Sequence, residues 1–534
     1  MQPVDHENQF NQKESSIFTS IILSIIIIGV LVFSAIVAVK YINPRSYLKQ
    51  MFGNKTYEAT PPSEDLPVLR ESKETIDLSK IVNLRDMLQN QEFERLNAVL
   101  EEYQHIFEEN QTDEYKVYDA YRTFYVTDPL HEEFFMKWVN RFPEKYQPYL
   151  AIAHYYSARG WESRGYKFSK ETSKEQFEGM RFNFSKAEEN IKTALEINPD
   201  LMVGYKILIN IYNATGNDAA EDETIENAIA LFPHSFLVRY TAAWAKQPRW
   251  GGSYKEIEEI AKEAERYSDI NPELTALYGL ISYDQSRINR RNKRYKKAID
   301  LLTKALKYGD HWSIFYERAK IYHFDLKDYD RALEDINRCI ELRLVIDEVY
   351  RMRSRVYFAK GHYTDSIEDL HTAQLLKPGD PSTIKWKEWA SKKLLSKGYK
   401  LLKTDIDAAF DSYNLSIEFD GDNFEAYYWR GLAFHQIEDF ESALSDFDRA
   451  IEINPHHFES YRMVDYMLAR NKQWDTIIIY WNKFLEVEPD HAGAYLERAG
   501  TNYHNNDLES ALDDLEKSCD LGNKEACIRY EKLK

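Results

Sequence analysis

Apolar and small residues recur every 34 positions along the C-terminal half of this chain. One register consists of Ala409, Ala443, Ile477 and Ala511. A repeat of this length is one supersecondary unit, which is too small to bury its apolar face alone and buries it by stacking on the next unit. The period therefore argues against a single compact core and predicts an extended solenoid.

Two further registers extend the period toward the N-terminus. Their positions are Ala298, Ala332 and Ser366 in one set, and Ala187 and Glu221 in the other. Together the three registers predict nine helical pairs, some of them degenerate. The step from Ser366 to Ala409 is 43 residues, so the surplus within 377–398 is expected to lengthen one helix or to add a turn.

Composition indicates what the units are built from. Glycine and proline are scarce, with 19 and 16 residues, whereas aromatic residues make up 14% and charged residues 29% of the chain. Such a composition is typical of packed amphipathic helices, so an all-α chain is predicted. The 69 basic and 88 acidic side chains give a formal net charge of −19, which disfavours binding to nucleic acid.

An uncharged segment near the N-terminus is long enough to span a bilayer. No charged residue occurs in the 23 residues from Ile17 to Val39, which measure about 34 Å as a helix. Acidic residues precede the segment, which argues against a cleaved signal peptide. We therefore predict a transmembrane helix at 17–40, between a tail at 1–16 and a linker at 41–75.

The flanking charges predict the side of the membrane on which the body lies. Lys13 is the only basic side chain before the span, whereas four follow it by residue 55. The positive-inside rule then predicts a single-pass protein of a bacterial inner membrane with a cytoplasmic body. A periplasmic body is the alternative, because large domains behind one anchor are often exported. Small residues such as Ser20 and Ser24 would let two spans associate into a homo-oligomer.

The clearest repeat unit is DNFEAYYWRGLAFHQIEDFESALSDFDRAIEINP, at residues 422–455. Its small, aromatic and proline positions resemble the tetratricopeptide repeat. That resemblance implies stacked helix pairs with a groove lined by the first helix of each pair, and an unknown protein or peptide as partner. The Lys and Asn arrangement with which chaperone-binding relatives hold a C-terminal carboxylate is not found in the repeats that align.

Counting from the small position Gly431 assigns arginines to two roles. Arg318, Arg353, Arg430 and Arg498 precede the small position of their units, where the resemblance implies a structural arginine. The candidates for the partner groove, where an acidic peptide would bind, are Arg351, Arg355 and Arg462.

Residues 76–270 are expected to form a helical domain with degenerate repeat pairs, followed by a repeat solenoid at 271–534. Two segments of the first part, SARGWESRGYKFSKETSKEQF and AKQPRWGGSYKEIEEIAKEA, depart from the repeat. With their neighbours they resemble, over about residues 90–265, a bacterial domain of unknown function that often accompanies tetratricopeptide repeats. The segment Trp250–Ser253 reads as a helix-breaking turn in which Ser253 caps the next helix. The alternative is a pocket for a carboxylate or phosphate, formed by Arg159, Trp161, Arg164, Arg249 and Trp250.

Seven basic residues stand close together in RINRRNKRYKK, at 287–297. They are expected to form an enlarged interhelical loop, which is either simply solvated or contacts anionic lipid or an acidic partner. The seven are Arg287, Arg290, Arg291, Lys293, Arg294, Lys296 and Lys297.

The chain has three cysteines, of which Cys519 and Cys527 flank DLGNKEA. This arrangement resembles the disulfide that ties a helix pair in cysteine-rich relatives of these repeats, although two packed thiols also fit the spacing. No phosphate-binding loop, dinucleotide fingerprint, zinc-protease motif or hydrolase elbow occurs. We therefore expect no enzyme, no cofactor and no metal.

The sequence as a whole predicts a membrane-anchored scaffold that recruits or organises protein partners at a bacterial inner membrane. The alternative is a receptor or enzyme that uses the anion pocket of the N-terminal helical domain.

Overall fold

A computed structural model describes residues 78–165, 171–343 and 345–534, and in this part of the chain every regular element is a helix. The predicted transmembrane span at 17–40 lies outside the described residues. Among the described helices none is long and apolar enough to cross a membrane. The described part belongs to one compact unit, Ser72–Lys534.

The first helices form a body with one continuous apolar core that runs from Leu84 to Leu280. The buried residues of the next core begin at Tyr283. The elements of this body are α3 (Leu78–Gln89), α4 (Phe93–Glu109), η1 (Gln111–Asp113), α5 (Glu114–Arg122), α6 (His131–Arg141), α7 (Tyr146–Arg164), α8 (Lys174–Ile197), α9 (Met202–Thr215), α10 (Asp218–Leu231), α11 (Phe236–Ala245), η3 (Pro248–Trp250), α12 (Tyr254–Glu265) and η4 (Pro272–Tyr278).

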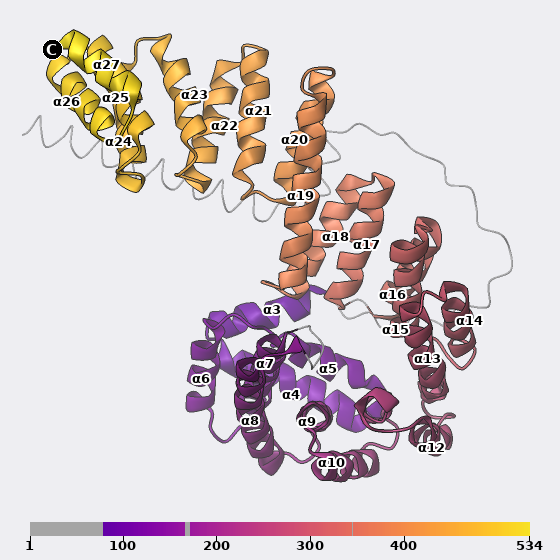
Figure 1. The fold of residues 1–534 in the computed structure, drawn as a ribbon. Coiled ribbons are helices and arrows are strands. Elements are labelled where there is room, and N and C mark those ends of the chain that lie inside the picture. Colours follow the sequence, from indigo (N-terminus) through magenta and orange to yellow (C-terminus); the bar gives the residue numbers. More distant parts are fainter. Residues whose placement is uncertain (1–77, 166–170, 344) are drawn as a thin grey trace, which may run out of the picture. The chain divides into compact units, whose positions relative to one another are not determined.

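The remaining helices stack pair upon pair, as Figure 1 shows. The first pairs are formed by α13 (Gly279–Arg291), α14 (Tyr295–Ala305), α15 (Trp312–Lys320), the π-helical η5 (Ile321–Leu326), α16 (Tyr329–Leu342), α17 (Asp347–Lys360) and α18 (Tyr363–Leu376). They are followed by α19 (Pro381–Leu401), α20 (Ile406–Phe419), α21 (Phe424–Gln436), α22 (Phe440–Ile453), α23 (Phe458–Ala469), α24 (Trp474–Val487), α25 (Ala492–His504), α26 (Leu508–Asp520) and α27 (Lys524–Leu533). All nine predicted pairs are present.

The 43-residue step is explained by one long helix. α19 has 21 residues, whereas α17 has 14 and α21 has 13. The surplus thus lengthens the first helix of a pair. Its partner α20 packs closely against it, because a Cβ atom at Gly398 would come within 2.5 Å of the Tyr413 ring.

The turn inside most pairs uses the same backbone conformation at the same period. The residues with positive φ include Lys293, Lys327 and Gly361, and then Glu438, Lys472 and Asn506, each 34 after the previous one in its series. Only Gly361 of these six residues is a glycine. At the other five positions the stacked helices hold a non-glycine residue at positive φ, a backbone conformation that costs free energy.

Arginines at one position join successive units. Arg430 binds both carboxylate oxygens of Asp446, at 2.8 and 2.7 Å, and its Nη1 donates to Asn414 of the preceding unit. Arg353 and Arg498 repeat this arrangement, and Arg318 repeats it with Thr303 in place of the asparagine. The prediction that these four arginines are structural is therefore confirmed.

The unit formed by α23 and α24 departs from this rule. The small position Gly431 corresponds to Asp465 one period later, and Phe447 corresponds to Trp481. Trp481 donates its indole N–H to Asp465 at 2.6 Å. Burial raises the pKa of this carboxyl to about 6, although the tryptophan hydrogen bond works in the opposite direction.

Candidate functional site

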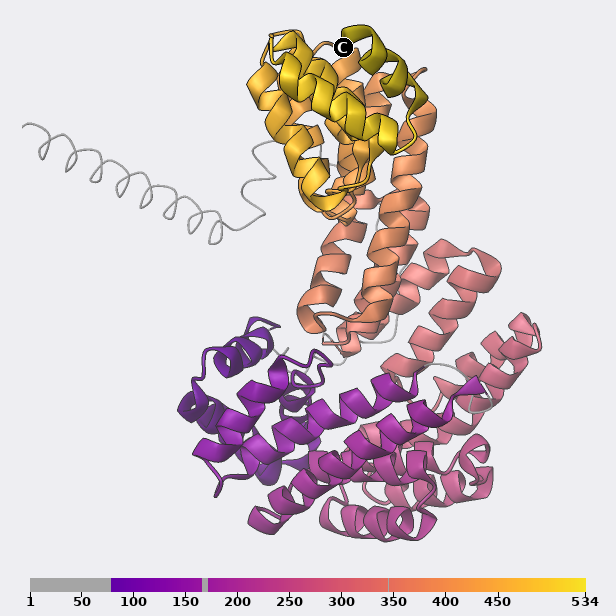
Figure 2. The same ribbon diagram turned by 60° about the vertical axis from the view of Figure 1, so that its left-hand side comes forward.

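Two ion pairs, one buried and one partly buried, fasten the N-terminal body to the repeats. Arg343, just after α16, pairs with Asp119 on α5, and the two residues are 7% and 2% exposed. Arg122, at the end of α5, binds Asp347 at the start of α17 at 3.1 Å. We call these four residues the clasp. Figures 1 and 2 show the purple N-terminal body beside the salmon helices of the first repeats.

Burial governs the charges of the clasp. It raises the pKa of Asp119, and the neighbouring Arg343 and Arg122 oppose that rise. The guanidinium of Arg343 also lies 4.1 Å from the centre of the Tyr115 ring. Each charge in this desolvated place thus depends on its partner.

Arg351 extends the clasp rather than facing an open groove. It binds Asp347 at 3.3 Å, Asp380 at 2.8 Å and the Thr383 hydroxyl at 2.9 Å. A ligand carboxylate would have to compete with these internal acceptors. Arg85 adds a further link, because its guanidinium donates to the carbonyl oxygens of Leu375 and Leu376.

Inside the clasp lie two adjoining cavities of about 430 and 360 Å³. We call them together the chamber. Residues of α5, α9, α15 and α17 line both cavities, so the chamber is built from the N-terminal body and from the repeats. The five residues common to both cavities are Tyr118, Lys206, Asn210, Trp312 and Glu348.

Polar groups without matching partners face the chamber. Lys206 is 6% exposed, and its ammonium donates to the Thr241 hydroxyl at 2.7 Å and to the Leu237 carbonyl at 3.4 Å and lies 4.8 Å from the Tyr118 ring centre. Within the described residues it has no carboxylate partner. Burial lowers its pKa. His154 is 5% exposed, and neither ring nitrogen has a hydrogen-bond partner among the described residues. Burial, with Lys206 and Arg122 adding to it, lowers the pKa of His154 to about 3, so the ring is neutral.

A second candidate surface lies on α19. Four of the exposed lysines of this helix lie near two exposed aromatic residues, Trp389 and Tyr399, which are 47% and 57% exposed. Their three- and four-residue spacing places them on one side of the helix, and none of the four lysines forms an ion pair with a described residue. We call this surface the α19 face; it comprises Lys385, Trp389, Lys392, Lys393, Tyr399 and Lys400.

The other two groove candidates differ in their surroundings. The guanidinium of Arg355 lies 5.9 Å from the Phe324 ring centre and 5.2 Å from that of Trp386, and its Nε has no hydrogen-bond partner within the described residues. Arg462 is half exposed and pairs with Glu459 and Glu497. Arg355 is therefore the candidate best placed to receive an acidic ligand.

The residues of the predicted anion pocket fall into two groups. On α7, Arg159 binds the Thr127 carbonyl and Glu162, Arg164 donates to the Gly165 carbonyl, and Trp161 lines the larger cavity. In the second group the guanidinium of Arg249 lies 4.7 Å from the Trp244 ring centre and 5.6 Å from that of Trp250. Neither Arg249 nor Trp250 lines the chamber.

The turn reading of the same segment is correct. Gly251 has φ of 103°, and Ser253 accepts the Glu256 amide at 3.3 Å to cap α12, which begins at Tyr254. A Cβ atom at Gly252 would come within 2.4 Å of the Lys246 carbonyl oxygen. The two glycines thus allow the chain to double back before α12.

The enlarged loop predicted at 287–297 is wrong, because α13 continues to Arg291 and α14 begins at Tyr295. Lys293 has the positive φ used by the other turns of the solenoid, so a tight turn suffices. Arg290 forms ion pairs with Glu317 and Asp325, and Arg287 lines the smaller cavity. The remaining basic residues are exposed, namely Arg291, Lys293, Arg294, Lys296 and Lys297.

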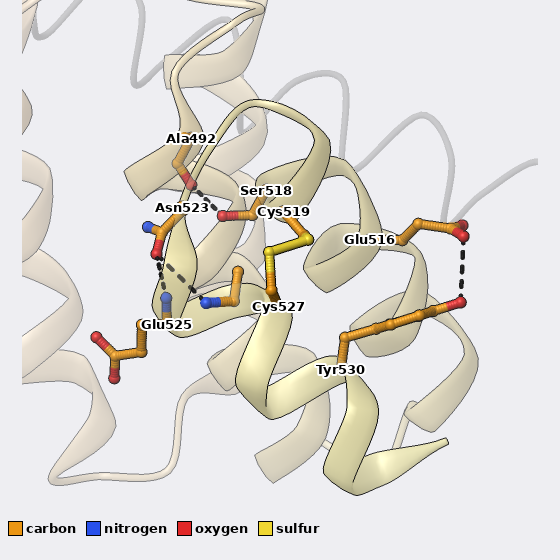
Figure 3. Close-up of a disulfide and its surroundings, with 9 residues drawn as sticks. Ala492, Glu516, Ser518, Cys519, Asn523, Glu525, Cys527 and Tyr530 are labelled. Atoms are coloured by element: carbon orange, nitrogen blue, oxygen red, sulfur yellow. Dashed lines mark hydrogen bonds between the residues drawn. A yellow bond between two sulfur atoms is a disulfide. The ribbon is translucent and has the colours of Figure 1, made fainter.

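A disulfide joins the last two helices. Cys519 on α26 and Cys527 on α27 are bonded, with their Cα atoms 4.7 Å apart (Figure 3). Asn523 caps α27 by accepting the Glu525 and Ala526 amides, and Tyr530 donates to Glu516 across the pair. Of the two alternatives left by the sequence, the structure has the bridge.

Comparisons with known families agree with the repeats. Residues 313–344 and 424–457 match the tetratricopeptide repeat, and residues 80–183 match a domain of unknown function, DUF4034. The chain therefore carries tetratricopeptide repeats behind a domain of unknown function, as predicted. The domain match ends at residue 183, short of the predicted extent of about 90–265.

Individual proteins are similar over parts of the chain. Stress-induced-phosphoprotein 1 of Caenorhabditis elegans is 26% identical over 164 residues, which are 30% of this chain and 47% of that protein. The chain thus spans less than half the length of this relative. The tetratricopeptide domain of P58(IPK) is 16% identical, with 65% and 92% of the chains covered and a TM-score of 0.23. YrrB, a repeat protein with an unusual peptide-binding site, is 18% identical, with 43% and 97% covered and a TM-score of 0.21.

Proposed function

We propose that this protein is a membrane-anchored scaffold whose repeats bind an acidic segment of a partner protein along the α19 face. The observation that carries the proposal is the row of unmatched lysines on that face. The chain as a whole has a net charge of −19, and α19 itself contains one acidic residue, Glu388. These lysines have no acidic partner within the described residues and lie near exposed aromatic rings, and the Lys393 ammonium is 5.9 Å from the Trp389 ring centre.

The chemistry of the face matches an acidic peptide with apolar anchors. Lysines on a helix surface attract carboxylates at long range and set the orientation of the encounter. Trp389 stacks on Trp386 with ring centres 5.0 Å apart, and Tyr399 contacts Trp429 at 4.7 Å, so each ring is held in place and still exposed. Rigid, partly exposed aromatic rings are the typical anchor points of protein interfaces. The matches to tetratricopeptide repeats favour a protein over a lipid surface as the occupant.

Photo-crosslinking tests this proposal in the full-length protein in membranes. A benzophenone amino acid in place of Tyr399 should capture a partner protein. The double reversal K392E/K393E should reduce the captured amount at least about tenfold, because each reversal replaces attraction by repulsion. The matched control K255E/K262E reverses two exposed lysines of α12, which are 84% and 63% exposed, and should leave capture unchanged.

A defined probe completes the test. A fluorescent peptide of Glu and Asp residues around one Trp should bind the wild-type protein and lose affinity as salt rises, whereas the same peptide with Lys for every acidic residue should not bind. Crosslinks to lipid alone, or equal binding of both peptides, would contradict an acidic protein partner.

The anchor of this scaffold rests on the uncharged stretch at 17–39. Replacing Ile26 and Ile27 by Asp should release the protein from membranes at alkaline pH, because charges at the bilayer centre are costly. For the side of the membrane we propose the periplasmic alternative, which the disulfide of Cys519 favours, since disulfides persist in oxidising compartments. Alkaline phosphatase fused after Lys534 should then be active; an inactive fusion at normal protein levels favours the cytoplasmic side that the flanking charges predict.

A further inference from the structure

Two side chains of opposite charge line both cavities of the chamber. Lys206 on α9 is buried and Glu348 on α17 is half-buried, and both line both cavities, but no ion pair joins them within the described residues. Elsewhere in the clasp, buried charges are paired directly, as Asp119 with Arg343 and Arg122 with Asp347. The partners of the Lys206 ammonium, namely the Leu237 carbonyl, the Thr241 hydroxyl and the Tyr118 ring, are all neutral. A buried charge without a countercharge is costly, so an ammonium and a carboxylate that line one chamber without pairing suggest that a ligand pairs with them.

The walls between these charges suit a small organic molecule. The rings of Tyr118 and Trp312 stand beside both charged groups, and the Asn210 amide lines the same shared zone. His154 adds two ring nitrogens that have no partner among the described residues. A cavity of this size, in which aromatic rings alternate with converging polar and charged groups, can hold a small ligand.

From these observations we infer that the chamber binds a small zwitterion of the amino-acid type, such as a short peptide with free ends. Its carboxylate lies at Lys206 and its ammonium at Glu348. The rings of Tyr118 and Trp312 cover its body, and the His154 ring and the Asn210 amide hydrogen-bond its polar groups. This site is separate from the α19 face, so its occupation does not depend on the partner proposed there.

Calorimetry on the full-length protein in detergent tests the charge pattern directly. The probes are the tripeptide Ala-Tyr-Ala with both ends free, its N-acetyl form and its C-terminal amide. Removing either ligand charge leaves one buried protein charge without a partner, so each derivative should bind about thirtyfold more weakly than the free tripeptide.

The variants assign each charge to one residue. Lys206→Met should abolish the preference for the free carboxylate and keep the preference for the free ammonium, and Glu348→Gln should do the converse. Lys255→Met, on the surface of α12, is the matched control and should bind all three probes like the wild type. Circular dichroism checks that the variants fold; if Lys206→Met does not, Glu348→Gln, which keeps the shape of the side chain, carries the test alone.

Three outcomes would overturn the inference. One is the absence of measurable binding of the free tripeptide at millimolar concentration. Another is equal binding of the free and charge-deleted peptides. The third is a variant that weakens all three probes to the same extent, because that result would indicate a general loss of structure rather than a lost charge pair.

Discussion

Breaking the clasp should loosen the contact between α5 and α17 while leaving the distant repeats intact. The perturbation is Arg343→Met, which keeps much of the side-chain volume and removes the charge. Removing one partner of a buried ion pair costs about 3 to 5 kcal/mol, because the other charge remains buried and unpaired. Arg122 still lies close to Asp119 and compensates in part, so we expect about 3 kcal/mol.

Hydrogen exchange on the full-length protein measures this cost locally. A loss of about 3 kcal/mol corresponds to exchange roughly 150-fold faster at 1.4 kcal/mol per factor of ten, in α5 and in the first turn of α17. The control is Arg338→Met, which removes a pair with Asp310 and Glu341 that is about one-third exposed. That change should cost less than about 1 kcal/mol.

The pH dependence provides a second check with a definite sign. Burial already raises the pKa of Asp119, and loss of Arg343 removes the strongest influence that lowers it. In the variant the folded-state pKa lies above the unfolded value, so its stability falls as the pH rises through the folded pKa. The stability that Arg343→Met loses relative to the wild type should therefore be larger at about pH 8 than at about pH 5. Adding Asp119→Asn to the variant should reduce this loss. Exchange in Arg343→Met that matched the wild type at both pH values would refute the clasp as a stabilising contact.

Three further predictions concern the repeats. Arg430→Met should destabilise α21 and α22 by about 2 to 3 kcal/mol, because it leaves the buried Asp446 without its partner. Arg449→Met removes an exposed pair on α22 and should leave the stability of the two helices almost unchanged; hydrogen-exchange rates of α21 and α22 compare the two variants. Cys519→Ser should lower the stability of α27 against α26 by about 2.5 kcal/mol on loop-closure grounds, and mass spectrometry of unreduced peptides should find the bridge in the wild type only. The pKa of Asp465 is raised to about 6, so its contribution to the stability of α23 and α24 is complete below about pH 4 and is lost as the pH rises through 6; Asp465→Asn should flatten that dependence in exchange experiments.

The local structure of the repeats could be predicted because it is periodic. A residue such as Arg430 meets a partner 16 positions away, and the same spacing recurs for Arg353 and Arg498. The tight turn within 287–297, predicted wrongly as an enlarged loop, also follows the 34-residue period, because Lys293 lies 34 residues before Lys327. Extending the register by one unit would have predicted the tight turn. The α19 face was also readable, since its lysines and aromatic residues follow helical spacing within the surplus segment.

The chamber could not be predicted in the same way. Asp119 and Arg343 are 224 residues apart, and Arg122 and Asp347 are 225 apart. No repeat period relates these positions, and single charged residues in a chain that is 29% charged carry no signal of their partners. Lys206 and Glu348 are ordinary charged residues by sequence, and only the folded structure brings both of them to one chamber.

The long sequence separation within each ion pair of the clasp also affects how easily the clasp opens. Closing a flexible loop of 224 residues would cost about 5 kcal/mol in chain entropy, which is as much as the removal of one partner of a buried ion pair costs. The helix pairs between the two ends remove most of that cost, because each pair fixes the position of the next. Loosening any pair between α9 and α16 should therefore open the clasp, even though the mutated residue touches neither partner. A ligand that bridges Lys206 and Glu348 would add a bond across the same gap, so its binding should slow exchange in α5 and α17 together, and the amidated or acetylated peptides should slow it less.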